Sequence, residues 1–312
     1  MMMDLVIVAI GLILLVVAGD ALVRGAVNLS LRLGIPPLIV GLTVVAFGTS
    51  APELLVSVSA VLDGVPGIAL GNVVGSNIAN VFLVLGIPAI ISTIHSSTLG
   101  VSRSYVIMLA ASALFVLLCF LGPIRWWHAL ILLAAMGATL WDNIHSARTQ
   151  KKLAAETLDG VDPGAPWWKV IGFLAVGLIG LPLGAELLVD GASGIARMFG
   201  ISETVIGLTL VAVGTSLPEL VTSIVAASKK QADVAMGNVI GSNIFNLLGI
   251  IGVAGLVGPI PVPATMLHSD LWVMLAAALI LIPFILMRRD ITRRVGIGFV
   301  IAYAVYTASL VL

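Results

Sequence analysis

Two glutamates lie inside apolar segments long enough to cross a lipid bilayer, and each directly follows a proline. Glu53 stands in segment 41–60, GLTVVAFGTSAPELLVSVSA, and Glu219 stands in segment 207–226, GLTLVAVGTSLPELVTSIVA. A carboxylate at membrane depth is costly, so an acid in such a segment indicates a functional site. Proline has no backbone N–H, and its ring clashes with the preceding turn, so each helix should break close to its glutamate.

Hydroxyl side chains stand four and three residues before each glutamate. They are Thr49 and Ser50 in the first segment, and Thr215 and Ser216 in the second. Residues at this spacing share one helical face with the carboxylate. Carbonyl oxygens freed by the break, around Ala46 and Ala212, are tolerated where they line a wet cavity, and there they can coordinate a cation. The hydroxyls have a second interpretation, since they could instead satisfy the backbone of the broken helix.

The two segments are copies at a fixed offset of 166 residues, and they match at 13 of 20 positions. Further on, GNVVGSNIAN at 71–80 recurs as GNVIGSNIFN at 237–246, with 8 of 10 positions identical. Both motifs carry a polar stripe spaced four apart, formed by Asn72, Ser76 and Asn80 in the first copy and by Asn238, Ser242 and Asn246 in the second. Asn72 and Asn238 could contact an ion or hydrogen-bond between helices. The GxxxG glycines within the motifs favour close helix packing.

Every one of these candidate ligands offers oxygen, which is the donor that hard cations such as Ca²⁺ and Na⁺ prefer, and Ca²⁺ takes about six to eight of them. Two glutamates would neutralise one Ca²⁺. Soft metals need Cys or His, which the motifs lack, and the single cysteine, Cys119, is interpreted as a small buried hydrophobe. Two bare buried carboxylates would be unstable, so ions or protons should occupy the site at all times, and this suits exchange better than open conduction.

The composition requires a membrane to hold these elements. Of the 312 residues, 60% are hydrophobic and 10% are charged, against about 25% charged in ordinary soluble domains. The net charge is zero, and no basic patch points to nucleic acid. The first residues lack the basic region of a signal peptide, so we interpret them as a retained first span. The expected fold is therefore an all-α membrane protein.

Apolar runs of about 20 residues mark membrane spans. We expect ten, at 4–31, 37–62, 66–94, 102–121, 125–146, 168–196, 202–228, 232–258, 267–287 and 294–312. The longest connection, 147–167, is the natural linker between a first half, 1–146, and a second half, 168–312.

The distribution of basic residues predicts the orientation, because cytoplasmic loops are enriched in Lys and Arg. With both termini outside and the linker in the cytoplasm, thirteen Lys and Arg fall at cytoplasmic ends, and only Arg125 and Arg197 fall outside. Corresponding spans are then five apart and cross in opposite directions. This predicts two inverted five-helix repeats, with broken helices 2 and 7 meeting at a central site near the midplane.

The paired motifs GTSAPE with GNVVGSNIAN, and GTSLPE with GNVIGSNIFN, resemble the alpha-1 and alpha-2 repeats of the sodium/calcium exchanger family, of prokaryotic type. This family lies within the cation/calcium antiporter superfamily, and the resemblance spans all ten expected helices. It implies a secondary antiporter that exchanges Na⁺ for Ca²⁺ by alternating access, with the first and sixth helices sliding across a rigid core. Both ions are then transported substrates, and neither an organic cofactor nor a protein partner is implied.

The resemblance also assigns the ligands. It implies Glu53 and Glu219 as the central Ca²⁺ and Na⁺ ligands. The flanking Na⁺ sites would be completed by Thr49, Thr215, Ser50, Ser216, Ser76 and Ser242, with the carbonyls of Ala46 and Ala212. Asn80 and Asn246 would lie at the middle position. Some members of the family carry Asp where this chain has Asn246, which lowers the charge of the site and leaves ion stoichiometry and proton participation open.

Three other functions would use some of the same sequence features. A proton-coupled Ca²⁺ exchanger, with H⁺ as a further partner, is the alternative. An intramembrane hydrolase could use paired acids, but the sequence has no HExxH and no nucleophile beside a His, so we expect no enzyme. A passive channel would ignore a counter-ion on the other side.

The remaining features bear on location. Asp20 and Glu186, also related by the offset of 166, should be solvated at the membrane interface or line an access path. Short loops and a minimal linker favour a prokaryotic protein of the cell (inner) membrane.

Overall fold

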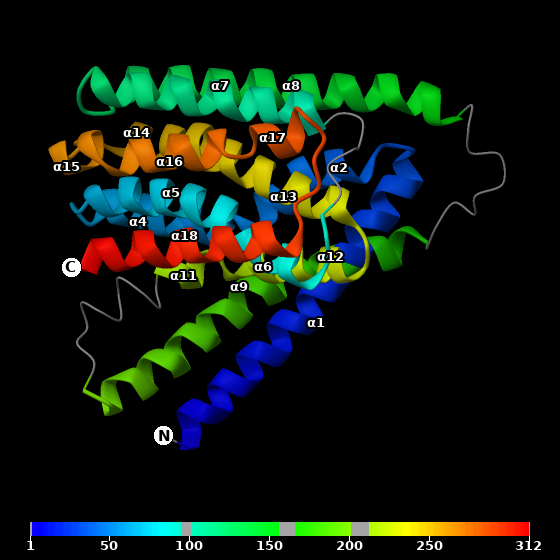
Figure 1. Cartoon of the computed structure of the whole chain (residues 1–312), viewed down its shortest axis with the longest axis horizontal. Coiled ribbons are helices and arrows are strands. Elements are labelled where there is room, and N and C mark those ends of the chain that lie inside the picture. The colour runs from blue at the N-terminus through cyan, green and yellow to red at the C-terminus, as the bar shows by residue number, and fades with distance from the viewer. Residues whose placement is uncertain (1, 95–100, 156–165, 201–211, 312) are drawn as a thin grey trace.

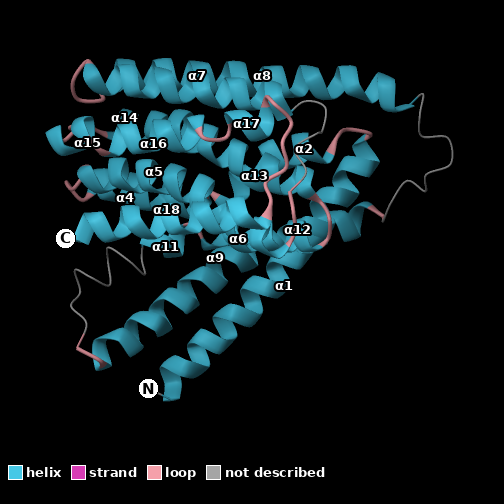
Figure 2. Cartoon of the chain, viewed as in Figure 1, coloured by secondary structure: helices cyan, strands magenta, loops and turns pink. Residues whose placement is uncertain are grey.

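The computed structural model describes residues 2–94, 101–155, 166–200 and 212–311, and the regular elements in them are helices (Figure 2). Extended pairing in these residues is limited to two isolated bridges, Ile94 with Ile291 and Ile124 with Ile260. A helix satisfies its own backbone hydrogen bonds, which is what a segment without access to water requires. The predicted all-α fold is confirmed.

The helices of the first half include two π-helical turns, η1 and η2. In chain order they are α1 (Met2–Leu33), α2 (Pro37–Val40), η1 (Gly41–Val45), α3 (Ala46–Thr49), α4 (Ala51–Leu62), α5 (Gly67–Ala79), η2 (Asn80–Val84), α6 (Gly86–Ile91), α7 (Val101–Phe120) and α8 (Trp126–Ala155).

The second half contains a further π-helical turn, η4. Its described helices are α9 (Trp167–Met198), α11 (Ala212–Thr215), α12 (Leu217–Ser228), α13 (Ala232–Ile244), η4 (Phe245–Ile250), α14 (Ile251–Val257), α15 (Ala264–His268), α16 (Asp270–Leu279), α17 (Ile282–Ile285) and α18 (Arg293–Val311).

Within the described ranges, six helical stretches are long and apolar enough to cross a membrane, and a bent pair would make seven. They are Met2–Leu33, Gly67–Ile91, Val101–Phe120, Trp167–Met198, Ala232–Val257 and Ala264–Ile285, with Pro37–Thr49 and Ala51–Leu62 as the bent pair. Part of the expected seventh span, 201–211, lies outside the described residues, and α8 and α18 are not among the six. Several membrane spans are therefore present, and the count of ten stays a prediction.

Helix α8 differs from its expected limits. We predicted a span ending at residue 146, whereas the helix continues to Ala155 and is 30 residues long. The added residues 147–155, ARTQKKLAA, are mostly strong helix formers, so the helix continues beyond the end of the apolar run. Apolar length and helix length are separate quantities in this segment.

Both predicted breaks are confirmed. At Ser50 the backbone leaves the helical region (φ −86°, ψ 9°), and α3 and α4 meet there at a bend of 44°. At Ser216 it does the same (φ −87°, ψ 3°) between α11 and α12. Pro52 and Pro218 then lie in the first turn of α4 and α12, where a missing N–H leaves no helical hydrogen bond unmade.

Helices α1 and α9 pack on each other as a pair and lie inclined to the remaining helices (Figure 1). A methyl group on Gly177 would lie 2.5 Å from Leu22 Cβ, and one on Gly184 would lie 2.9 Å from Leu15 N. Glycine at these positions allows the two backbones to approach closely. The pair contributes to a hydrophobic cluster separate from the large one formed around α5, α7, α13, α14 and α16.

Helix α13 lies in the interior, with every residue from Val234 to Ile244 buried. The segment α2–η1 packs directly against it. A methyl group on Gly237 would lie 2.6 Å from the carbonyl oxygen of Leu38, and one on Gly241 would lie 2.6 Å from that of Leu42. The GxxxG pair of the second motif is therefore a packing surface, as predicted. A methyl group on Gly71 or Gly75 of the first motif would meet no described atom within 4 Å, so the prediction is not met there.

Candidate functional site

The two glutamates are brought together in the interior. Glu53 is in the first turn of α4 and Glu219 is in the first turn of α12, and each is 1% exposed. Ser50, three residues before Glu53, hydrogen-bonds Glu219 Oε1, so the starts of the two helices lie together. Neither glutamate forms an ion pair with another described residue, and the Oε2 atom of each is buried without a hydrogen-bond partner there. Buried carboxylate oxygens in this state need a cation or a proton to be stable.

The two serines at the breaks reach across between the halves of the chain. The hydroxyl of Ser50 donates to Glu219 Oε1 at 2.8 Å, and that of Ser216 donates to Ser76 Oγ at 3.4 Å. Ser242 also donates to Glu219 Oε1, at 3.4 Å. All of the serines singled out by the motifs therefore lie at one place, and two of them hydrogen-bond the same carboxylate oxygen.

The two threonines also cross between the halves. Thr49 Oγ1 donates to Asn238 Oδ1 at 3.1 Å, and Thr215 Oγ1 donates to Asn72 Oδ1 at 3.4 Å. Each threonine thus ties its broken helix to the long helix of the other half. This arrangement fixes the position of α3 against α13 and of α11 against α5.

Asn72 and Asn238 hydrogen-bond between helices, which was one of the two interpretations left open. Each donates to the backbone carbonyl of the glutamate in its own half, at 3.2 and 3.3 Å. Each also donates to a buried serine, Ser57 at 3.1 Å and Ser223 at 3.3 Å. The sequence reading missed these serines, although both stand four residues after a glutamate and are related by the offset of 166.

Asn80 and Asn246, each 1% exposed, present unpaired amide atoms to the interior. Asn80 Nδ2 donates to Asn243 Oδ1 at 3.0 Å, and its Oδ1 has no partner among the described residues. Neither Oδ1 nor Nδ2 of Asn246 has one. Together with the glutamate oxygens, these atoms form a buried polar set that hydrogen bonds within the described protein leave incomplete.

The backbone at Ala46 differs from the expectation of a freed carbonyl. Its oxygen accepts from the N–H of Ser50 at 3.1 Å and from the hydroxyl of Thr49 at 3.4 Å. The reason is geometric, because Pro52 removes the partner of the carbonyl four residues earlier, which belongs to Gly48. Around Ala212 the pattern is different, since Ser216 N–H donates to the carbonyl of Val213 at 3.1 Å.

Asp20 lies outside this site. Its carboxylate pairs with Arg24 at 2.6 Å on its own helix, and it also pairs with Lys229, which directly follows α12. Glu186, its counterpart, is exposed on α9. Asp20 is therefore part of an ion pair joining two helices, an arrangement that neither of the expected roles included.

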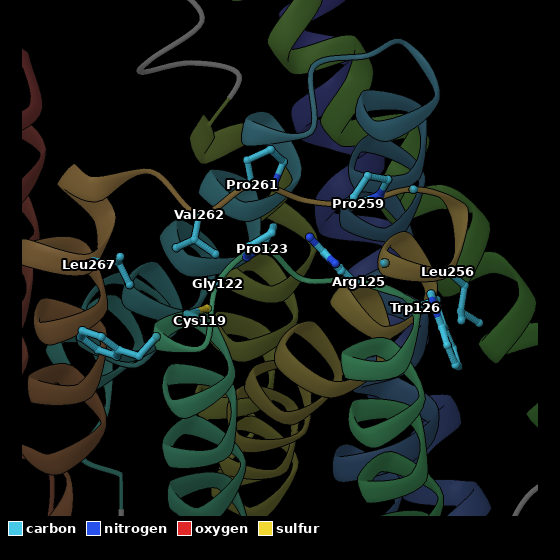
Figure 3. A pocket seen from close by; sticks show the side chains of 13 residues that line it. Cys119, Gly122, Pro123, Arg125, Trp126, Leu256, Pro259, Pro261, Val262 and Leu267 are labelled. Carbon is cyan, nitrogen blue, oxygen red and sulfur yellow. The ribbon is translucent and has the colours of Figure 1, made fainter.

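A large cavity of about 880 Å³ opens elsewhere, between the α7–α8 turn and the segment after α14 (Figure 3). Arg125, Trp126, Leu256, Pro259 and Val262 are among its lining residues. Neither glutamate lines it, so its size does not make it the site of the carboxylates.

The donor set limits the chemistry of the site. Among the described residues, no group of three or more His, Cys, Asp or Glu gathers as a metal cluster. The arrangement instead combines two carboxylates with neutral hydroxyl and amide oxygens, which suits hard cations better than transition metals. Apolar helices around buried oxygen atoms of this kind are what a helical membrane transporter of cations requires.

Comparisons with known proteins identify the family. A family model described as sodium/calcium exchanger protein matches residues 3–142 and 169–312. The chain is 33% identical to the sodium/calcium exchanger MaX1 of Methanosarcina acetivorans, with 98% of each protein covered. It is 37% identical to the putative antiporter CaxA of Alkalimonas amylolytica, with 90% of this chain and 89% of the relative covered.

A solved structure of the sodium-calcium exchanger NCX_Mj, soaked with Na⁺ and Ca²⁺, has the same fold. The TM-score is 0.84 at 34% identity, over 99% of this chain and 98% of the other. The chain therefore belongs to the sodium/calcium exchanger family, a family of multi-pass membrane transporters rather than enzymes, and the resemblance noted from the two motifs is confirmed.

Proposed function

We propose that this protein is a secondary antiporter that exchanges Na⁺ for Ca²⁺ by alternating access at the buried site between its two halves. One observation carries the proposal. Glu53 and Glu219, each on a helix broken at a Ser-Xaa-Pro turn, come together in the interior with carboxylate oxygens that no described residue satisfies. Such a site is stable only when it holds cations or protons, so an ion leaves as another enters.

The proposed ligands are the residues singled out by the motifs. Glu53 and Glu219 bind the central Ca²⁺ and take part in Na⁺ binding. The remaining ligands are the oxygens of Thr49, Thr215, Ser50, Ser216, Ser76, Ser242, Asn80 and Asn246, with the backbone carbonyls of Ala46 and Ala212. Two carboxylates balance one Ca²⁺, and neutral oxygens raise the coordination number toward the six to eight that Ca²⁺ prefers.

The assignment of two roles follows the hydrogen bonds. The amides of Asn72 and Asn238 are occupied by the glutamate backbone and by serines, so they hold the broken helices in place. The backbone oxygen of Ala46 already accepts two hydrogen bonds, and binding Na⁺ there requires the Thr49 hydroxyl to turn toward the ion.

For the architecture we propose ten spans in two inverted repeats, 1–146 and 168–312, joined by a cytoplasmic linker at 147–167. The turn between α7 and α8 and the C-terminus lie at one end of the molecule, and the last turn of α8 and the start of α9 lie toward the other (Figure 1). This agrees with a C-terminus and a linker on opposite sides of the membrane. From the Lys and Arg distribution we propose that both termini lie outside and the linker lies in the cytoplasm, in the inner membrane of the cell.

The α1–α9 pair supports alternating access. Its helices are joined to each other through glycine contacts, and they share a hydrophobic cluster that also includes residues of α2, η1, α12 and α13 and is separate from the main one. A pair packed in this way can shift against the remaining helices as one body, exposing the site first to one side and then to the other.

Proton coupling is the second candidate. Glu53 Oε2 and both amide atoms of Asn246 have no partner among the described residues, and a protonated carboxyl could replace a cation there. The relative named CaxA is called only an antiporter, and its name does not state the counter-ion. Neither the hydrolase nor the channel is proposed, because the chain belongs to an exchanger family.

The test is exchange by the purified full chain in liposomes. Vesicles loaded with Na⁺ are diluted into Na⁺-free buffer, and uptake of radiolabelled Ca²⁺ is measured for the unaltered protein, Glu53→Gln and Glu219→Gln. Asp190→Asn, which changes an exposed carboxylate on α9, is the matched control. Uptake that needs Na⁺, is lost in both glutamate variants and is kept in the control would support the proposal. Uptake driven only by a pH gradient would establish the proton-coupled reading instead.

A further inference from the structure

Two residues outside the proposed ligand set, Asn243 and Met108, form a chain of hydrogen bonds with Asn80. Asn243 Nδ2 donates to the sulfur of Met108 at 3.6 Å, and Asn80 Nδ2 donates to Asn243 Oδ1 at 3.0 Å. We propose that Met108 and Asn243 are positioning residues that fix the Asn80 amide with its oxygen facing the bound cation. The inference rests on the proposed function and deepens it, because it names what makes Asn80 a cation ligand.

The direction of these two hydrogen bonds follows from the acceptor at one end, the sulfur of Met108. A thioether sulfur can accept a hydrogen bond and cannot donate one, so Asn243 must turn its NH₂ group toward Met108. Its carbonyl oxygen then faces Asn80, and Asn80 must present its own NH₂ group. The carbonyl oxygen of Asn80 is left pointing away from this chain, and it is the Asn80 atom without a partner among the described residues.

Burial makes this orientation costly to reverse. Met108 is 0%, Asn80 1% and Asn243 3% exposed, so bulk water does not replace a lost partner. Turning the Asn80 amide over would set two carbonyl oxygens against each other and point an NH₂ group at the cation. The Asn80 side chain is therefore held with its carbonyl oxygen available as a ligand before any ion arrives. Ion binding then does not have to restrict the rotation of this side chain.

The other half has the same residue types in a different arrangement. Asn77 and Met274 stand at the positions related to Asn243 and Met108 by the offset of 166. Asn77, however, donates to the carbonyl of Val73 on its own helix, at 2.7 Å. Asn246, the counterpart of Asn80, has no partner on either amide atom. The Asn243–Met108 chain therefore orients one of the two central amides and not the other.

The experiment measures equilibrium binding of radiolabelled Ca²⁺ to the purified full chain, with and without competing Na⁺. Asn243→Ala removes both hydrogen bonds, the one to Met108 and the one from Asn80. Met108→Leu keeps the side-chain volume and removes the hydrogen-bond acceptor. Asn77→Ala and Met274→Leu make the same changes in the other half. With one ligand no longer oriented, we expect the Ca²⁺ Kd to rise about tenfold in Asn243→Ala and about threefold in Met108→Leu, and by less than about twofold in the controls.

A double-mutant cycle separates positioning from a general loss of structure. If Asn243 acts through Asn80, then Asn243→Ala added to Asn80→Ala should leave the Kd unchanged within about twofold. A purely structural role would weaken binding equally in both backgrounds. Met108→Leu supplies the same comparison with a volume-conserving change, should Asn243→Ala fail to fold.

The outcomes are distinct. The positioning role would be overturned if Asn243→Ala weakened Ca²⁺ binding equally with and without the Asn80 side chain, or if Asn77→Ala weakened it as much as Asn243→Ala does. Either result would leave the exchanger proposal intact. Absence of Ca²⁺ and Na⁺ binding by the unaltered, folded protein would overturn the proposed function, and this inference with it. Binding by the unaltered protein that weakens only through Asn80 would establish the role.

Discussion

The two broken helices of this protein have nearly the same sequence and different surroundings. Glu219 receives hydrogen bonds from two serines, at 2.8 and 3.4 Å. The Oε2 atom of each glutamate has no partner in the described protein, but the serine that corresponds to Ser50, Ser216, donates to Ser76 and not to Glu53. Corresponding residues of the two motifs are thus held in two arrangements within one molecule.

The cover over the two helices also differs. Helix α1 lies along α12, where a methyl group on Gly19 would be 2.9 Å from Val221 Cγ1. Thr222 on α12 is fully buried, whereas its counterpart Val56 on α4 is 36% exposed. At these positions α12 is therefore covered more closely than α4.

We interpret this difference through the two inverted repeats proposed above. Two copies related by a pseudo-symmetry axis need not adopt the same conformation. If the two copies exchange conformations, a state open to one side of the membrane becomes a state open to the other side. On this view the structure represents one of two states, the one in which α1 closes over α12. The predictions that follow test where the two halves are equivalent and where they differ.

The largest effect should be equal in both halves. Replacing either carboxylate by an amide leaves a Ca²⁺ with one charge uncompensated in a buried site, so we expect Glu53→Gln and Glu219→Gln each to reduce Na⁺-dependent Ca²⁺ uptake by about 100-fold or more. Initial uptake rates in liposomes check this. If one variant kept near-normal rates, the two glutamates would not be functionally equivalent, and the shared site would be wrong.

The next prediction breaks the equivalence of the central amides. Asn246→Asp loses no hydrogen bond and adds a charge, so it should tighten Ca²⁺ binding about tenfold. Asn80→Asp cannot donate to Asn243 and sets two oxygens together, so it should gain less and should also lower the unfolding temperature by several degrees. Ca²⁺ titrations and thermal unfolding of both variants decide. Equal behaviour of the two would count against an oriented Asn80.

A smaller difference is expected at the break serines. Ser50→Ala removes a hydrogen bond to a carboxylate, while Ser216→Ala removes one to another hydroxyl. Hydrogen bonds to charged groups are the stronger kind, so the Ca²⁺ concentration for half-maximal uptake should rise about fivefold in Ser50→Ala and about twofold in Ser216→Ala. The reverse order would show that the conformation with Ser50 on Glu219 is not the one that sets affinity.

The smallest effect concerns the ion pair of Asp20 with Lys229, which joins α1 to the end of α12. The related positions carry Glu186 and Asp63, two like charges, so the sequence offers no such pair in the other half. A partly exposed pair contributes roughly 0.2–1 kcal/mol, so Lys229→Gln should increase maleimide labelling of Thr222→Cys by about 1.4- to fivefold in a background lacking Cys119.

The matched control for the ion pair is Lys230→Gln, which changes the neighbouring charge. Screening by added salt should reproduce the effect of Lys229→Gln in the unaltered protein. If neither Lys229→Gln nor added salt changed the labelling of Thr222→Cys, the ion pair would not be a cause of the cover of α12 by α1.

Much of this site could be predicted from the sequence, because its main features are local. The breaks at Ser50 and Ser216 follow from proline chemistry, and the inward face of the glutamates follows from helical spacing. The partners of Asn77 and Asn243 could not be predicted, since the same GSN triplet hydrogen-bonds its own helix in one half and a neighbouring residue in the other. That choice depends on three-dimensional packing, as does the ion pair of Asp20.

The length of the paired helices has a consequence for the lipid. Helices α1 and α9 have 32 residues each, about 48 Å at 1.5 Å per residue, and a hydrocarbon core is about 30 Å thick. Helices of this length tilt in the membrane or extend into its headgroup layers, and Figure 1 shows both inclined to α7 and α8. Hydrophobic mismatch therefore acts on the very helices whose movement we propose, and acyl-chain length becomes a physical input to the exchange rate.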